Sequence, residues 1–145
     1  MDRRELLTEV FSDTADWIEC TSELKNSVSE SINKTKLYME ENIPEAEYEK
    51  SFETEISVTA SRSYEAAMRL RKEYPDAKIA VHNFASATNP GGGVTHGASA
   101  QEECLCRCST LYPVISNGKV REYYNYHRRK NDLRYSNACI YSPDI

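Results

Sequence analysis

At the start of the chain, apolar residues recur every three to four positions on one helical face: Leu6, Leu7, Val10, Phe11, Trp17 and Ile18. Such spacing predicts an amphipathic helix over residues 3–19. Residues 21–50 are rich in Ser, Glu, Asn and Lys, and they fit a helix face as well as short strands and loops. We assign no structure there, except that Pro44 ends whatever element precedes it.

From residue 52 the pattern changes to alternation of apolar and polar residues, which predicts a half-buried strand over Phe52–Thr59. A helix follows, with Ser61 or Ser63 as its cap and Pro75 as its end. The apolar run KIAVHNF, Lys78–Phe84, is typical of a central strand covered on both faces. Strand, helix and strand in this order predict a parallel βαβ unit.

The last third of the chain alternates loops with short helical patterns. A loop over residues 85–98 precedes a helix over about residues 100–111, and a second helical piece begins near Val120 and ends in the basic run over residues 128–130. The basic run over residues 128–130 indicates a solvated helix end, with contact to an anionic ligand as the alternative. Residues 137–141 read as a final strand. The predicted fold class is therefore α/β.

Composition and charge narrow the class of protein. The 145 residues suffice for one domain, and Leu, Ile, Val and Phe make up only about 18% of them, which is a thin core. The formal net charge of −5 argues against generic binding to nucleic acid or to anionic membranes. We find no apolar run long enough for a transmembrane helix and no signal-peptide pattern, so we expect a cytoplasmic protein.

The five cysteines do not form a recognisable framework. Their odd number does not fit a set of disulfides, and Cys104, Cys106 and Cys108 are spaced too closely for structural zinc. We therefore expect small, reduced core residues, no metal and no cofactor.

Glycine is concentrated at one place. Four of the five glycines fall within residues 91–97, after the Asn89-Pro90 turn signal and the predicted central strand. Ser99 and Glu102 match the Ser-x-x-Glu capping box of the next helix. A strand, a glycine loop and a helix N-terminus together predict an anion-binding site, with free backbone N–H groups facing a phosphate. A tight surface loop is the alternative, and no Lys follows the glycines as in a P-loop.

Two acids stand in the first turn of that helix. Glu102 has a structural role in the predicted capping box, whereas Glu103 has none. Beside a phosphate-binding loop, Glu103 is the better candidate for general acid/base chemistry. As a general acid it would need a raised pKa, through burial or a nearby phosphate.

The residues around this loop carry a family resemblance. The segments NFAS at 83–86, NPGGG at 89–93 and QEE at 101–103 resemble the signature of poly(ADP-ribose) glycohydrolases. The flanking STLY at 109–112 and YSPD at 141–144 are similar to the microbial branch of that family. The resemblance implies a macrodomain-like mixed sheet flanked by helices. Residues 51–145 would be its N-terminal half, and residues 1–50 a helical or irregular extension.

The resemblance also implies an activity, the hydrolysis of ribose–ribose O-glycosidic bonds in poly(ADP-ribose). Glu103 would be the catalytic acid/base and Glu102 would hold the ribose hydroxyls. Substrate would also meet Asn83, Gly91, Gly92, Gly93, Val94 and Gln101. The expected partners are ADP-ribose, poly(ADP-ribose) or ADP-ribosylated proteins, together with a second copy or a separate C-terminal half. The alternatives are an ADP-ribose-binding module and an inactive fragment.

Overall fold

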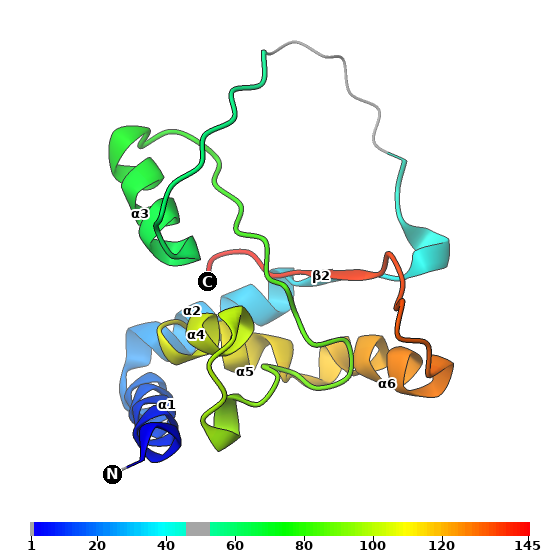
Figure 1. Cartoon of the computed structure of the whole chain (residues 1–145), viewed down its shortest axis with the longest axis horizontal. Coiled ribbons are helices and arrows are strands. Elements are labelled where there is room, and N and C mark those ends of the chain that lie inside the picture. The colour runs from blue at the N-terminus through cyan, green and yellow to red at the C-terminus, as the bar shows by residue number, and fades with distance from the viewer. Residues whose placement is uncertain (1, 46–52) are drawn as a thin grey trace. The chain divides into compact units, whose positions relative to one another are not determined.

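The computed structural model of the chain describes residues 2–45 and 53–145. The chain divides into two compact units. One combines residues 1–43 with residues 83–145, and the other spans residues 44–82. The described part is mostly helical (Figure 1).

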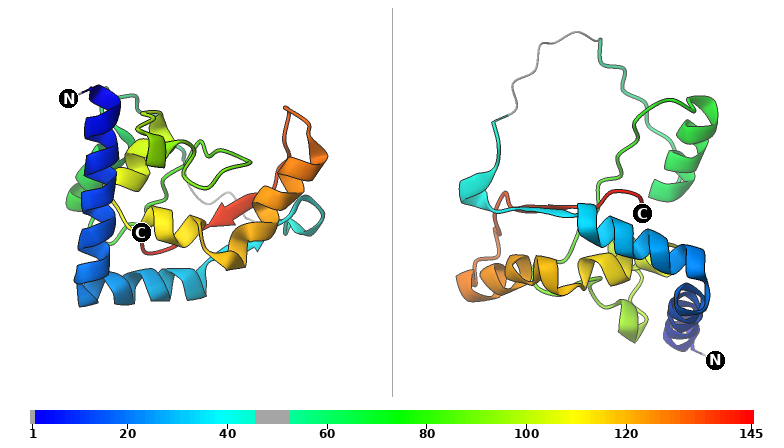
Figure 2. Two further views of the ribbon diagram at one scale, coloured as in Figure 1. Left: turned by 90° about the horizontal axis from the view of Figure 1, so that it is seen from below. Right: turned by 180° about the vertical axis from the view of Figure 1, so that it is seen from behind.

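The N-terminal third forms two helices with a sharp turn between them (Figure 2). α1 spans Arg3–Cys20 and confirms the predicted first helix. At its start the Glu5 carboxylate accepts a hydrogen bond from the N–H of Asp2 at 2.8 Å. α2 spans Ser22–Lys34, within the segment that the sequence pattern left open.

The core of the first unit is built where α1 and α2 meet the C-terminal helices. α4 (Gln101–Arg107) packs on α1 and on α5 (Leu111–Ile115), and α5 packs on α2. The predicted helix over 100–111 is thus broken after Arg107. Among the most deeply buried side chains are Val94, Cys106, Val114 and Val120.

The last helix confirms the second helical prediction. α6 spans Arg121–Lys130, directly after the short 3₁₀ helix η3 (Gly118–Val120). Its histidine, His127, is a satisfied core residue, since Nδ1 lies 2.7 Å from the Tyr123 carbonyl and Nε2 lies 2.9 Å from Ser136 Oγ. The basic run at the end of α6 is exposed, as expected of a solvated helix end.

The sheet in the described residues has only two strands. β1 (Lys36–Tyr38) pairs antiparallel with β2 (Cys139–Tyr141), with Leu37 opposite Ile140. The predicted strand at 137–141 is therefore confirmed over its last three residues. A short 3₁₀ turn, η1 (Glu40–Asn42), follows β1.

The two other predicted strands, and with them the parallel βαβ unit, are wrong for the described residues. Residues 53–59 and 78–84 have no strand structure, and Phe52 lies outside the described residues. A strand exists only through hydrogen bonds to a neighbouring strand. The alternating and apolar residues of these segments would suit the faces of a strand. In the described residues, however, no other segment forms hydrogen bonds to their backbone as a neighbouring strand would.

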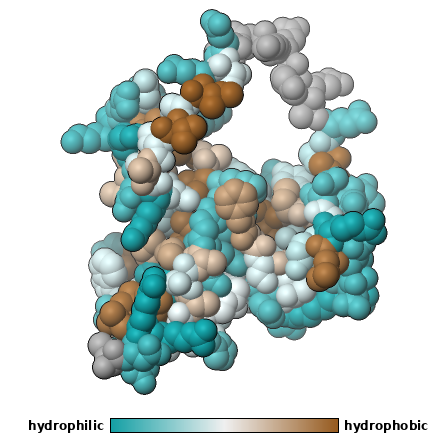
Figure 3. All heavy atoms as spheres, in the orientation of Figure 1, coloured by the Kyte–Doolittle hydropathy of each residue, from teal (hydrophilic) through white to brown (hydrophobic). Residues whose placement is uncertain are grey.

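The second unit contains α3 (Ser63–Glu73) between these two extended segments. Its N-cap is Arg62, so neither predicted serine cap is correct, and the N–H of Arg62 donates to Glu65 at 2.9 Å. No residue of α3 is buried. Ile56 and Val58 are 85% and 94% exposed, and hydrophobic side chains are visible along this segment in Figure 3.

Cysteine burial differs from expectation. Cys106 is buried, but Cys20, Cys104, Cys108 and Cys139 are exposed. Cys20 and Cys104 lie on the outer faces of α1 and α4, and Cys108 follows α4. Cys139 lies in the edge strand β2. All five are free thiols. Over residues 2–45 and 53–145, His, Cys, Asp and Glu side chains form no group that could hold a metal ion. No helix in these ranges has both the length and the apolar character needed to cross a membrane.

Candidate active site

The glycine loop is a series of tight turns that only glycine accommodates at two positions. The N–H of Gly92 donates to the carbonyl of Asn89 at 3.0 Å, and the N–H of Val94 donates to the carbonyl of Gly91 at 3.1 Å. Gly91 and Gly92 have φ values of 68° and 58°, in the left-handed region. A Cβ on Gly92 would also overlap the carboxylate of Glu103. The loop is therefore shaped around that acid.

Glu102 turns its carboxylate back onto this loop. Its Oε2 accepts a hydrogen bond from the N–H of Ser86 at 2.8 Å, and its Oε1 accepts one from the N–H of Gly91 at 3.2 Å. The predicted capping box with Ser99 is wrong, because α4 takes Ala100 as its N-cap. Glu102 is thereby the second helical residue, whereas the box requires a Glu at the third.

The environment of Glu102 favours its protonated form. Burial raises the pKa of Glu102 above the ordinary value, and the nearby Glu103 carboxylate adds to the rise. The donors from Ser86, Asn83 and Gly91 oppose this rise by stabilising the charged form. Glu102 thus combines a fixed position with a greater affinity for a proton.

Glu103 is held through one oxygen only. Its Oε1 accepts a hydrogen bond from the N–H of Gly93 at 2.9 Å, so the expectation that it has no structural contact was wrong. Its Oε2 is buried and has no hydrogen-bond partner among the described residues. The side chain itself is 7% exposed. A buried carboxylate oxygen without a donor carries a desolvation cost, and such exceptions require a functional explanation.

The predicted free N–H groups of the loop are not free. Those of Gly91 and Gly93 donate to the two glutamates, and those of Gly92 and Val94 donate to carbonyls within the loop. The expected phosphate cradle is therefore absent from this stretch of backbone. The loop positions two carboxylates instead.

The remaining predicted residues lie around the same two acids. Gln101 accepts a hydrogen bond from the N–H of Phe84 at 2.7 Å through Oε1. Asn83 interacts with Glu102, while its Oδ1 is buried and has no hydrogen-bond partner in the described chain. Val94 is 1% exposed, and its side chain lies next to Gly91. The structure thus brings all the predicted site residues together.

Arg107 is a member of this network that the sequence pattern did not reveal. It is 7% exposed, and its guanidinium donates to the carbonyl of Ala98 at 2.6 Å. The N–H of Ala98 in turn donates to the carbonyl of Gly93 at 3.1 Å. Arg107 therefore ties the far end of the loop to α4. The sequence offered one signal for this role, since Arg107 is a charged residue that directly follows the apolar residues Leu105 and Cys106.

Ser86 was also missed as a site residue, although it belongs to the quoted NFAS segment. Besides holding Glu102, it accepts a hydrogen bond from the N–H of Asn89 at 3.1 Å through Oγ. It thereby fixes the entry into the glycine loop, a local turn that Ser side chains form readily.

Comparisons with known proteins identify the family of this chain. Residues 16–145 match the model of the family described as "Microbial-type PARG, catalytic domain". A poly(ADP-ribose) glycohydrolase from Thermomonospora curvata is similar in structure, with a TM-score of 0.82 and 31% identity, over 97% of this chain and 55% of that one. The same enzyme bound to the inhibitor ADP-HPD gives a TM-score of 0.79 at 31% identity, and a glutamate-to-alanine mutant gives 0.81 at 30%, each over 97% of this chain and 54% of that one. The chain spans about half the length of these solved structures. A search of curated proteins gave no match.

Proposed function

We propose that this chain, which belongs to the microbial-type poly(ADP-ribose) glycohydrolase family, hydrolyses ribose–ribose O-glycosidic bonds in poly(ADP-ribose) and releases ADP-ribose. The observation that carries the proposal is the buried Glu103 carboxylate. One of its oxygens is fixed by Gly93 and the other is left without a partner. An oxygen held in this way is ready to exchange a proton with a substrate.

In the proposed reaction Glu103 first acts as an acid. It protonates the glycosidic oxygen while the bond from that oxygen to the anomeric carbon breaks, which leaves an oxocarbenium-like sugar. Glu103 then accepts a proton from a water molecule that attacks the anomeric carbon. The proton balance closes, and the products are two ribose hydroxyl groups.

The other site residues would position the substrate. Both carboxylate oxygens of Glu102 are held by backbone N–H groups, which suits a group that orients ribose hydroxyls rather than one that moves a proton. Asn83 and Gln101 would orient substrate or the acids, and Gly91, Gly92, Gly93 and Val94 would bring backbone close to the ribose.

The finer structural predictions belong to the same proposal. A mixed sheet of macrodomain type would form when residues 53–59 and 78–84 find partner strands in a C-terminal half or a second copy. Residues 1–50 would then be an extension and residues 51–145 the N-terminal half of the catalytic domain. ADP-ribose, its polymer or ADP-ribosylated proteins would be the ligands, in keeping with the inhibitor complex of the relative.

The test compares the unchanged chain with Glu103→Gln in release of free ADP-ribose from poly(ADP-ribose). We expect the variant to lose at least about 100-fold in rate, as is typical for loss of a general acid, and to keep its affinity for ADP-ribose. Glu23→Gln, the same change at an exposed position in α2, is the control and should match the unchanged chain. Equal release by Glu103→Gln would refute the role, and binding without release by the unchanged chain would favour a binding module.

A further inference from the structure

A cavity lies beside the Asn89-Pro90 turn, which leads directly into the glycine loop. It has a volume of about 170 Å³, below the roughly 300–1,000 Å³ typical of pockets for drug-sized ligands. It can hold a phosphate group but not a nucleoside. Its lining residues are Pro90, Ser116, Asn117, Arg121, Tyr124, Asn125 and Arg128.

The cavity is positively charged. Arg121 and Arg128 lie seven residues apart on α6, about two turns, and so share one face. No acidic residue is among those that line it. The guanidinium of Arg121 has no hydrogen bond or ion pair to another side chain or backbone group in the described ranges, and that of Arg128 has only two contacts of 3.5 Å, to Asn125 and Asn89. Two guanidinium groups therefore remain available.

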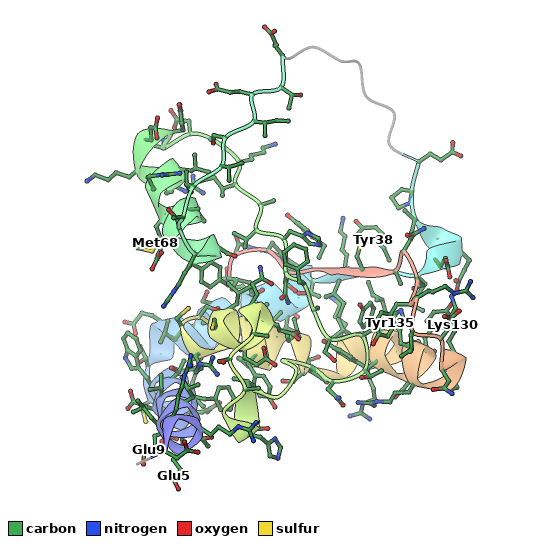
Figure 4. All side chains as sticks on the ribbon, in the orientation of Figure 1. Glu5, Glu9, Tyr38, Met68, Lys130 and Tyr135 are labelled. Atoms are coloured by element: carbon green, nitrogen blue, oxygen red, sulfur yellow. The ribbon has the colours of Figure 1, made fainter. Side chains whose placement is uncertain are left out.

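The other basic residues of α6 are already engaged. Arg129 is paired with Glu122, and Lys130 lies 3.2 Å from the Glu40 carboxylate. Figure 4 places Lys130 at the end of α6 that is remote from α5. Only Arg121 and Arg128 of this helix face the cavity with weak or no intramolecular partners.

The neutral lining groups also present hydrogen-bond donors. The amide oxygen of Asn117 accepts from the N–H of Lys119 at 2.9 Å, and that of Asn125 accepts from Arg128. Each amide thus keeps its NH₂ group for a ligand. Burial raises the pKa of the Tyr124 phenol, with a contribution from Glu102, so the phenol stays protonated at neutral pH. Tyr124 thus lies near enough to Glu102 to be affected by its charge, and Pro90 directly precedes Gly91, so the cavity adjoins the candidate active site.

We propose that this cavity binds a phosphate group, and that in the substrate this group belongs to the diphosphate of an ADP-ribose unit next to the bond that is cut. The inference rests on the proposed function and names where the polymer continues. Elsewhere in the site, the loop N–H groups are used by Glu102 and Glu103, and the two carboxylates would repel a diphosphate. The arginine cavity is the nearby place where the charge is favourable.

The first experiment follows binding of inorganic pyrophosphate to the whole chain by NMR chemical-shift titration, which requires no catalysis. We expect saturable shifts for Arg121, Arg128 and the Asn117 amide. Arg121→Gln and Arg128→Gln should each weaken binding about tenfold, since one charge-assisted contact is lost. Arg129→Gln, on the same helix and with the same loss of charge, is the matched control and should bind as the unchanged chain does. Unchanged binding in both cavity variants, or equal weakening in the control, would overturn the proposal.

A second arm separates the two sources of phosphate. Affinities for ADP-ribose and for a trimer of ADP-ribose are compared in a Glu103→Gln background, so that no substrate is consumed. We expect the cavity variants to weaken the trimer more than the monomer. If the cavity variants weaken binding of the trimer and of the monomer equally, the cavity is a site for free phosphate only and the polymer contact is overturned. Failure of the proposed function, seen as equal release of ADP-ribose by Glu103→Gln and by the unchanged chain, is a separate result from either outcome.

Discussion

The glycine loop with α4 and the unit of residues 44–82 differ in which side chains they bury. Around the loop, two carboxylates and a guanidinium are buried, and each is bound to specific backbone groups. In the other unit Ile56, Val58 and Met68 are largely exposed, and α3 buries no residue. The first region buries polar side chains and holds them by hydrogen bonds, whereas the second leaves apolar side chains exposed.

The difference shows how each region depends on its surroundings. The loop network is closed within the described chain, apart from the Oε2 atom of Glu103 and the Oδ1 atom of Asn83. The second unit keeps a helix, whose hydrogen bonds are local, but not the strands, whose hydrogen bonds must come from elsewhere. Substitutions in the loop should therefore lower the free energy of unfolding strongly, and substitutions in the extended segments should change it little.

The largest effect is expected for Gly92→Ala. The left-handed φ of 58° and the overlap of the new Cβ with the Glu103 carboxylate act together, so we expect a loss of about 3 kcal/mol or more in the free energy of unfolding. Urea unfolding measures this loss. Gly118→Ala is the control, because a Cβ there meets nothing within 4 Å. Equal stability of the two variants would show that the loop is not shaped around the acid.

Arg107→Met should come next, with a loss of about 2–4 kcal/mol. The variant keeps the apolar stem but removes the guanidinium that holds the Ala98 carbonyl, and a partly buried acceptor loses this donor. Amide hydrogen exchange at Gly93 should rise together with the loss of stability. Arg129→Met, at an exposed position, should leave both quantities unchanged. Unaltered exchange at Gly93 would separate Arg107 from the loop.

Glu102→Gln should cost about 1–2 kcal/mol at pH 7, since one of the two backbone donors then faces an NH₂ group. It should also change the pH dependence. The folded pKa of Glu102 lies above its ordinary value of 4.5, so the native state binds more protons than the unfolded state. Its contribution to stability therefore grows as the pH falls from 7 towards 4.5 and is lost as the pH rises through the folded pKa.

The variant lacks this titration, so its unfolding free energy should gain less over the same pH range. Unfolding curves of the variant and of the unchanged chain at several pH values measure the difference. Identical slopes for Glu102→Gln and the unchanged chain would contradict the raised pKa.

The smallest effect is expected when Ile56 and Val58 are both replaced by Ser. Their side chains are exposed, so the free energy of unfolding should change by no more than about 0.5 kcal/mol. Urea unfolding of the double variant tests this expectation. A loss as large as that of Arg107→Met would show that these side chains are buried, and the contrast between the two regions would not hold.

Helices were predicted better than strands, and the reason is physical. The spacing of apolar residues placed α1 and α6 within one or two residues, because a helix carries its hydrogen bonds within its own segment. The same reasoning placed strands at 52–59 and 78–84, whose described residues have no partner strand, and it could not choose between helix and strand for α2. Of the three predicted strands, only the last was correct in the described residues, as β2, which pairs with β1.

For the candidate site, the sequence determined part of the residue set: the glycine cluster and the two acids after it were evident from spacing, and the resemblance added Asn83 and Gln101, whereas Ser86 and Arg107 were missed. It also determined the family, through the same segments. Only the tertiary structure decided what these residues do to one another. Glu102 and Glu103 consume the loop N–H groups that a phosphate was expected to use, and Arg107 anchors the loop from within α4. Residue type and spacing fix which groups are available, but hydrogen bonds are allotted by distance and burial, which arise only when segments far apart in the sequence pack together.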